Sequence, residues 1–205
     1  MGKTGPDFTI ELAAMRKGAR PVCGIDEAGR GPWAGPVVAA AVVLDPACIP
    51  AGLDDSKKLT EARRAALFAP IMASAKVGIG IAEVDRIDRD NILQATLWAM
   101  AQALGQIGGA ALALIDGNRA PPLPCPVETI VAGDAKSFSI AAASIVAKVT
   151  RDRIMVGHDA SWPGYGFARH KGYGTAFHRA ALQRLGPSPV HRRSFAPIAA
   201  LLAER

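Results

Sequence analysis

Five apolar runs rich in valine, isoleucine or alanine alternate along the chain with segments whose apolar residues recur near helical spacing. The runs are short and end at glycine, proline or charged residues, as buried β-strands do. They predict strands at 21–26, 36–44, 77–83, 111–115 and 127–131. The periodic segments predict helices at 60–73, 86–106, 137–157, 175–185 and 194–204.

Strands that precede helices indicate an α/β sandwich. Because the early strands lack long connections, we expect hairpins and a mixed sheet rather than a purely parallel one. We divide the chain into an N-terminal extension (1–20), an α/β core (21–157) and a basic C-terminal part of the same single domain (158–205). Residues 158–174, rich in glycine and aromatic side chains, are expected to form a loop that leads to a C-terminal helical module.

The composition fits one globular domain, because 205 residues that are 50% hydrophobic suffice for a sizeable core. The net charge of +6 is unevenly distributed. Residues 148–205 hold ten Lys or Arg against three Asp or Glu, whereas residues 1–147 hold fourteen against fifteen. This asymmetry is compatible with a solvated basic surface or with a nucleic-acid interface.

The three cysteines, Cys23, Cys48 and Cys125, are far apart and form no CxxC pair, so neither a disulfide framework nor a zinc site is expected. Residues 1–20 carry Asp7 and Glu11 where a signal peptide needs an apolar segment. No apolar run approaches the roughly 20 residues that span a bilayer. We therefore expect a cytoplasmic monomer without a membrane partner.

Two adjacent carboxylates, Asp26 and Glu27, end the first predicted strand and precede a Gly-Arg-Gly turn. An unpaired carboxylate is costly to bury in a strand, so the pair needs solvent, a cation or another partner. Adjacent strand residues point to opposite faces, and both side chains reach one ion only if the strand bends or ends there. We expect a bend at Ala28–Gly29. A solvated turn is the alternative interpretation of these two residues alone.

Two further acids occupy similar places. Asp116 follows the run 111–115, and Asp134 lies between a strand and a long helix, where it could instead be the helix N-cap. Active sites of α/β proteins gather at such strand ends. Four carboxylates without histidine or cysteine form a hard oxygen-donor set suited to Mg²⁺ or Mn²⁺. Two such ions about 3.5–4 Å apart can activate a water and stabilise the leaving oxygen in phosphodiester hydrolysis.

Seven motifs, in order from about Pro21 to Pro197, resemble those of the type 2 ribonuclease H family, ribonuclease HII. They are GIDEAGRGPWAGPVVAAAVVL, LDDSKKLT, IDRDNILQAT, LIDGN, GDAKSFSIAAASIVAKVTRD, YGFARHKGYGT and HRRSF. The resemblance implies a ribonuclease H-like fold, with a mixed five-stranded sheet flanked by helices and a C-terminal helical extension. It also implies that Asp26, Glu27, Asp116 and Asp134 are the catalytic metal ligands, for two Mn²⁺ or Mg²⁺ ions bound with substrate.

The activity implied by the resemblance is endonucleolytic cleavage of RNA in RNA–DNA hybrids, leaving 3′-hydroxyl and 5′-phosphate ends. It includes cleavage 5′ to a single ribonucleotide in duplex DNA, so the expected partners are RNA–DNA hybrids and ribonucleotide-containing duplex DNA. The family's Gly-Arg-Gly loop matches Gly29, Arg30 and Gly31, whose backbone would meet a ribose 2′-hydroxyl while Arg30 meets a phosphate. Tyr173 matches the family's junction-sensing tyrosine.

Other candidate substrate contacts are weaker. Five basic side chains are candidate phosphate contacts: Lys57, Lys58, Lys148, Arg169 and Lys171. Ser144 matches a family position near the substrate backbone, but a serine on a helix among alanines also fits a structural role.

Two other functions compete with this one. A related nuclease or recombinase of the same fold would act on DNA alone, but it would have no 2′-hydroxyl for a Gly-Arg-Gly loop to detect. A non-catalytic nucleic-acid-binding module is the second alternative. The four acids argue against it, because carboxylates without metal repel phosphate.

Overall fold

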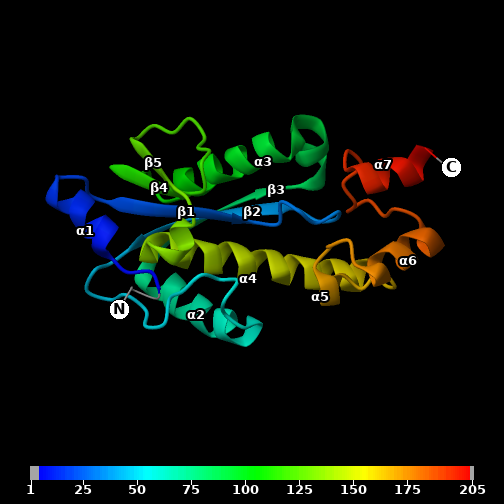
Figure 1. Ribbon diagram of the computed structural model, residues 1–205, viewed down its shortest axis with the longest axis horizontal. Coiled ribbons are helices and arrows are strands. Elements are labelled where there is room, and N and C mark those ends of the chain that lie inside the picture. Colours follow the sequence, from blue (N-terminus) through cyan, green and yellow to red (C-terminus); the bar gives the residue numbers. More distant parts are fainter. Residues whose placement is uncertain (1–4, 204–205) are drawn as a thin grey trace.

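A mixed five-stranded sheet runs through the middle of the molecule in the computed structural model, which describes residues 5–203 (Figure 1). Its strands are β1 (Val22–Ala28), β2 (Val37–Leu44), β3 (Ala75–Ala82), β4 (Leu112–Asp116) and β5 (Val127–Ile130). Their order is β3-β2-β1-β4-β5, with β1, β2 and β3 antiparallel and β1, β4 and β5 parallel. The five predicted strands and the mixed sheet are confirmed.

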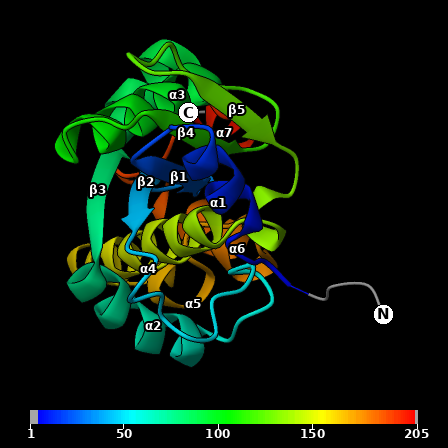
Figure 2. The same cartoon turned by 90° about the vertical axis from the view of Figure 1, so that its left-hand side faces the viewer.

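Helices cover both faces of the sheet: α3 lies on one face and α4 on the other, with α2 outside α4 (Figures 1 and 2). The helices are α1 (Thr9–Arg16), α2 (Glu61–Ser74), α3 (Val84–Gln106), α4 (Phe138–Ser161), α5 (Phe167–His170), α6 (Ala176–Leu185) and α7 (Ala196–Ala203), with a 3₁₀ turn η1 (Gly133–Ala135). The five predicted helices are confirmed, while α1, α5 and η1 were not predicted. Among the described helices, none combines the length and hydropathy that a bilayer crossing requires. The first four residues of the predicted N-terminal extension and the end of the predicted helix 194–204 lie outside the described residues.

Small side chains form the centre of the core. In β2, Val38, Ala40 and Val42 pack toward α4, while Val37, Ala39 and Ala41 pack toward α3, and all six are fully buried. The facing part of α4 is also alanine-rich, at 141–143. Helix and sheet backbones therefore lie close together. At Gly24 of β1, an added Cβ would lie 2.1 Å from the carbonyl carbon of Ser139 in α4.

The loop expected at 158–174 is wrong in part. Helix α4 continues to Ser161, and Phe167–His170 form the single turn α5. The turn exists because Phe167 is fully buried in a small cluster of its own, where its ring stacks on Tyr165 with centroids 5.2 Å apart. Figure 1 shows α5, α6 and α7 together at one end of the molecule, with α1 at the other.

The N-terminal helix α1 is fastened to the start of α4 by one carboxylate. Oε1 of the fully buried Glu11 accepts hydrogen bonds from the Ser137 hydroxyl at 2.6 Å and the Ser139 N–H at 2.8 Å. Ser137 in turn caps α4, where its hydroxyl accepts from the Ile140 N–H at 3.2 Å. A carboxylate is favourable at a helix N-terminus, because it satisfies free N–H groups and meets the positive end of the dipole. Helix α1 thereby fixes the segment that follows Asp134.

Replacing Glu11 by glutamine is expected to lower the free energy of unfolding by about 2 kcal/mol, because the amide weakens two buried hydrogen bonds. Urea unfolding followed by circular dichroism measures the change. The matched control is Glu128→Gln, on the exposed side of β5, which should change stability by less than about 0.5 kcal/mol. Equally small effects of both substitutions would contradict the structural role of Glu11.

Candidate active site

The parallel pairing of β1 with β4 brings two of the predicted metal ligands together. Ile25 pairs with Ile115 in this register, so the next residues, Asp26 and Asp116, lie side by side. Gly24, two residues before Asp26, and Leu114, two residues before Asp116, both face α4. Because side chains alternate along a strand, both acids project from that same face of the sheet. Sequence position alone could not show this, because ninety residues separate the two acids.

Asp26 is a buried carboxylate whose charge is poorly compensated by the chain. Only 4% of the residue is exposed, and its Oδ1 accepts a 2.7 Å hydrogen bond from the Glu27 N–H. Burial, followed by the charges of Glu27 and Asp116, raises the pKa of Asp26 well above its usual range, and the Ser144 hydroxyl only partly opposes this. Such a group is stabilised by a cation.

Glu27 lies on the opposite face of β1, toward α3. The expected bend falls at Gly29, with φ +96°, because Ala28 still pairs with Val38 of β2. Glu27 Oε1 accepts a 3.2 Å charged hydrogen bond from Arg30. Burial raises the pKa of Glu27, Arg30 opposes this shift, and Asp116 adds to it. The charge of Glu27 therefore interacts with those of Asp26 and Asp116, although its side chain projects from the opposite face of the sheet.

Asp116 also holds the turn that carries Asp134. Its Oδ1 accepts a 2.7 Å hydrogen bond from the Gly133 N–H, the residue before Asp134 in η1. Asp134 is buried, and its Oδ2 lies 3.4 Å from Lys57 Nζ. Burial raises the pKa of Asp134; Lys57 opposes this, and Asp116 adds to it. The alternative that Asp134 caps α4 is wrong, since Ser137 is the cap.

The donor chemistry of these four carboxylates fits a hard divalent cation, because three of them carry raised pKa values that a nearby cation would lower. Their arrangement is open rather than closed. Among residues 5–203, no three His, Cys, Asp or Glu side chains stand ready to enclose one ion. Arg30 and Lys57 instead provide counter-charges to Glu27 and Asp134.

A cavity of about 150 Å³ lies next to the carboxylates and joins several predicted substrate contacts. It is lined by Glu27, Ala28, Gly29, Ser56, Lys57, Arg64, Ser144, Lys148 and Tyr173. A second cavity of about 100 Å³ on the other side of Glu27 contains Arg30 and Asp116. Gly31 lies beside Tyr173, one of the residues that line the first cavity, because a Cβ on Gly31 would lie 3.7 Å from Cε1 of that ring. The structure thus brings the Gly-Arg-Gly loop, the tyrosine and the acids together.

Three of the predicted phosphate contacts are exposed cations. The Lys57 side chain is 78% exposed and reaches back to Asp134. Lys58 is also exposed, with its ammonium 4.0 Å from Asp54. Arg169 lies farther along the chain in α5, outside both cavities. A phosphate contact by Lys57 would lie beside the acids, whereas one by Arg169 would lie near α5 at the end of the molecule where α6 and α7 lie.

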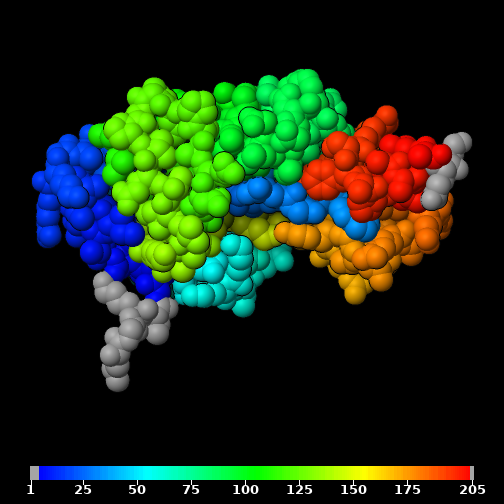
Figure 3. Space-filling model, turned by 45° about the horizontal axis from the view of Figure 1, so that its top comes forward, coloured from blue at the N-terminus to red at the C-terminus, as the bar shows by residue number. Residues whose placement is uncertain are grey.

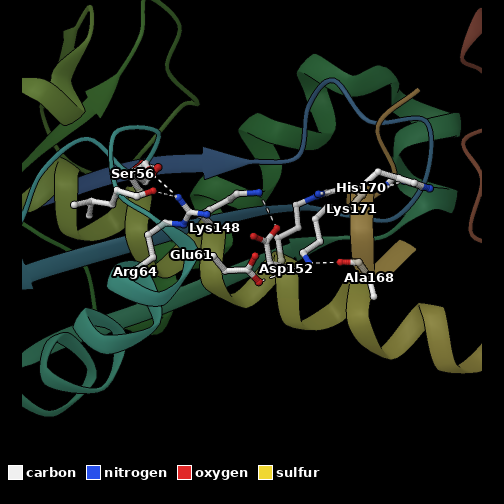
Figure 4. A network of polar contacts seen from close by, with 12 residues as sticks. Ser56, Glu61, Arg64, Lys148, Asp152, Ala168, His170 and Lys171 are labelled. Carbon is white, nitrogen blue, oxygen red and sulfur yellow. Dashed lines mark hydrogen bonds and ion pairs between the residues drawn. The ribbon is translucent and has the colours of Figure 1, made fainter. Parts of the chain in front are cut away.

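The other two predicted phosphate contacts, Lys148 and Lys171, belong to a polar network between α2, α4 and α5 (Figure 4). Lys148 Nζ donates to Asp152 at 2.7 Å. The Lys171 side chain is only 12% exposed, donates to the Ala168 carbonyl and lies 3.7 Å from Glu61. Both ammonium groups have partners within the chain, and Lys171 presents little charge to the surface.

Arg64 and Ser56 are site residues that the sequence analysis did not identify. Arg64 Nη1 donates to the carbonyls of Ser56 at 2.7 Å and Leu59 at 2.5 Å, which holds the loop that carries Lys57 (Figure 4). The Ser56 hydroxyl shares a 2.7 Å hydrogen bond with Ser144. Arg64 also lines a further cavity of about 400 Å³ between α2 and α4, and none of the four acids lines it. Ser56 lies within the LDDSKKLT motif, whereas Arg64 follows it in the first turn of α2 and belongs to none of the seven motifs.

The chain is similar to known proteins along nearly its whole length. A sequence model of the family "Ribonuclease HII" matches residues 23–198. The ribonuclease HII of Azorhizobium caulinodans is 62% identical over 197 residues, which cover 96% of this chain and 76% of that protein.

Two solved structures resemble this one. Ribonuclease HII from Archaeoglobus fulgidus, solved in complex with PCNA, matches with a TM-score of 0.75 and 24% identity, over 88% of this chain and 96% of that one. Bst-RNase HIII in complex with Mn²⁺ matches with a TM-score of 0.66 and 20% identity, over 94% of this chain and 72% of that one. At these identities the likeness concerns the fold, and it confirms the ribonuclease H-like sheet with flanking helices.

Proposed function

The chain belongs to the ribonuclease HII family and is a ribonuclease H endonuclease, and on that premise we propose that it cleaves 5′ to single ribonucleotides in duplex DNA as well as within RNA–DNA hybrids. One observation carries the proposal: a single cavity is lined by Glu27 of the acid cluster, by Gly29 of the Gly-Arg-Gly loop and by Tyr173. A phosphate at the acids would place its ribose beside the loop and the next nucleotide beside the tyrosine.

Asp26, Glu27, Asp116 and Asp134 would hold the divalent ions, either Mg²⁺ or Mn²⁺, two of them when substrate is bound. The oxygen-only donor set and the buried charge of Asp26 support this, as does the Mn²⁺ complex of the structurally similar Bst-RNase HIII. When bound, such ions supply the activation of the attacking water and the stabilisation of the leaving oxygen, giving 3′-hydroxyl and 5′-phosphate ends.

The residues of the chain itself select and orient the substrate. The backbone of Gly29–Gly31 would meet the 2′-hydroxyl, which is the group that distinguishes RNA from DNA. Arg30 and the cations Lys57, Lys58, Lys148 and Arg169 would contact phosphates without reading sequence, whereas Lys171 is largely covered and bound to partners within the chain. Ser144 touches Ser56 and opposes the raised pKa of Asp26, which supports a role in ordering the carboxylate next to the substrate backbone.

The test uses the purified protein and three duplexes of one sequence: all DNA, DNA with one ribonucleotide, and an RNA–DNA hybrid, each with Mg²⁺ and with Mn²⁺. The expected result is cleavage of the hybrid and a single cut 5′ to the lone ribonucleotide, with the all-DNA duplex intact. A protein that cuts only the hybrid would refute the single-ribonucleotide activity. Cleavage of all-DNA duplex would favour a DNA nuclease, and binding without any cleavage would favour a non-catalytic module.

Alanine in place of Tyr173 is expected to slow cleavage at the single ribonucleotide about tenfold, while affinity for the duplex changes less, because the ring would pack on the deoxyribose beyond the cut. Single-turnover rates and fluorescence anisotropy measure the two quantities. The control is Phe177→Ala, since Phe177 is 49% exposed, close to the 47% of Tyr173, but lies outside the cavity. Equal losses of affinity and rate would count against junction sensing.

A further inference from the structure

Arg192, a fully buried arginine of the HRRSF segment, binds the backbone of the Gly-Arg-Gly loop from the inside of the protein. Arg192 donates hydrogen bonds to four backbone carbonyls, those of Gly29 at 2.5 Å, Arg30 at 2.9 Å, Gly35 at 2.9 Å and Pro36 at 3.1 Å. Two of these carbonyls belong to the loop that the proposed function assigns to the ribose. The arginine therefore fixes the direction in which each of those two peptide groups points.

The direction of these carbonyls decides what the loop presents on its outer side. In a trans peptide, the carbonyl of one residue and the N–H of the next point in opposite directions. Because the Gly29 and Arg30 carbonyls point toward Arg192, the N–H groups of Arg30 and Gly31 point away from it. Both residues are exposed, and within residues 5–203 neither N–H has an acceptor. Two adjacent backbone donors thus face outward.

The same segment reaches the loop of Tyr173. The Arg192 N–H donates to the Trp33 carbonyl at 2.8 Å, and the Trp33 N–H donates to the Gly172 carbonyl at 2.9 Å. Figure 3 shows the blue chain near residue 30 between the red C-terminal segment and the orange segment of α6. Arg192 and Trp33 therefore connect the Gly-Arg-Gly loop to the segment that carries Tyr173.

A chain of histidines provides a second link to Tyr173. The Ser188 N–H donates to His191 Nδ1 at 2.9 Å, so the proton of that ring is on Nε2. His191 Nε2–H then donates to His178 Nε2 at 2.9 Å, and His178 Nδ1–H donates to the Tyr173 carbonyl at 3.0 Å. Burial lowers the pKa of both rings to about 4, which keeps them neutral at physiological pH.

We propose that Arg192 is a positioning residue for substrate selection. It directs the N–H groups of Arg30 and Gly31 toward the oxygen of the ribose 2′-hydroxyl. His191 and His178 fix the position of Tyr173 relative to these two donors. The inference rests on the proposed function, in which the loop meets the ribonucleotide. It assigns the selectivity of the cavity to a residue that touches no substrate. A lysine could not replace it, because one ammonium cannot span four carbonyls as a planar guanidinium does.

The test compares Arg192→Lys with the matched control Arg193→Lys, whose side chain is exposed on the next residue. Fluorescence anisotropy gives the affinities for two duplexes of one sequence, all DNA and with one ribonucleotide, in Ca²⁺ without Mg²⁺ or Mn²⁺. Arg192→Lys should reduce the preference for the ribonucleotide duplex about tenfold, with the all-DNA affinity within about twofold of the wild type. Arg193→Lys should keep the preference. A folded Arg192→Lys variant that also keeps it would overturn the proposal.

A second measurement needs no variant, which matters because the loss of four buried hydrogen bonds can prevent folding. The amide resonances of Arg30 and Gly31 in the wild-type protein should shift further when the ribonucleotide duplex is added than when the all-DNA duplex is added. Equal shifts with both duplexes would overturn the proposal. If the wild type also cuts at the ribonucleotide, the proposed function survives that result; if it does not cut, the proposed function itself fails.

Discussion

Asparagine in place of Asp26 is expected to reduce kcat/KM on an RNA–DNA hybrid by at least about a thousandfold. Asp26 lies beside Asp116 at the buried centre of the four acids, so the amide removes a charged oxygen donor from the cluster. The measurement uses saturating Mg²⁺ and, separately, Mn²⁺. Asp85→Asn, an exposed acid in the first turn of α3, is the control and should keep wild-type activity. A fully active Asp26→Asn variant would refute the site assignment.

The stability of the same variant separates loss of the site from loss of the fold. Burial and the neighbouring carboxylates raise the pKa of Asp26, so its ionised form opposes folding at neutral pH. In EDTA, Asp26→Asn should therefore unfold with a free energy equal to or higher than that of the wild type. Added Mn²⁺ should raise the Tm of the wild type more than that of the variant, because an ion that binds the folded state stabilises it. If the variant is less stable than the wild type in EDTA, its inactivity results from damage to the fold and not from loss of the site.

Alanine in place of Gly24 is expected to lower the free energy of unfolding by more than about 4 kcal/mol, which is most of the stability of a marginal domain. The added methyl would lie 2.1 Å from the Ser139 carbonyl carbon and 2.3 Å from the Ile140 nitrogen. Both atoms belong to the backbone of α4, which cannot rotate aside as a side chain can. Strand β1 and helix α4 would have to separate, and the acids at the end of β1 would move with them.

Gly157→Ala is the matched control, because Gly157 lies in α4 itself and an added Cβ there has nothing within 4 Å. It should raise the free energy of unfolding by about 0.5–1 kcal/mol, the usual gain of alanine over glycine inside a helix. Urea unfolding of both variants decides the question. A small loss for Gly24→Ala would mean that the helix and sheet yield more readily than their spacing indicates.

The local pattern was sufficient to predict the sheet and the main helices, because each is long enough to show its own periodicity. It could not predict α1 or α5. Helix α1 owes its place to Glu11, whose partners Ser137 and Ser139 lie far along the chain, and α5 is a single turn built around the buried Phe167. Contacts of this kind depend on the tertiary fold, which a window of neighbouring residues does not contain.

The four acids could be singled out from the sequence because each lies near the end of an apolar run. Their proximity depends on the register of β1 with β4, and their counter-charges Arg30 and Lys57 depend on the fold of two loops. Arg192 lies in the HRRSF motif, but its role could not be predicted. Its hydrogen bonds are made to backbone carbonyls, which every residue has. Roles that a side chain performs on the backbone are the hardest to predict from sequence.

The alanine-rich centre of the core has a consequence for how this chain can change during evolution. Where two backbones are separated by little more than methyl groups, trimming a side chain removes few atoms, and enlarging one forces whole elements apart. Substitutions to larger residues at Ala39–Ala41 of β2 or along the buried face of α4 should therefore be rarer among viable variants than substitutions to smaller ones. The centre of the core therefore accommodates small side chains more readily than large ones.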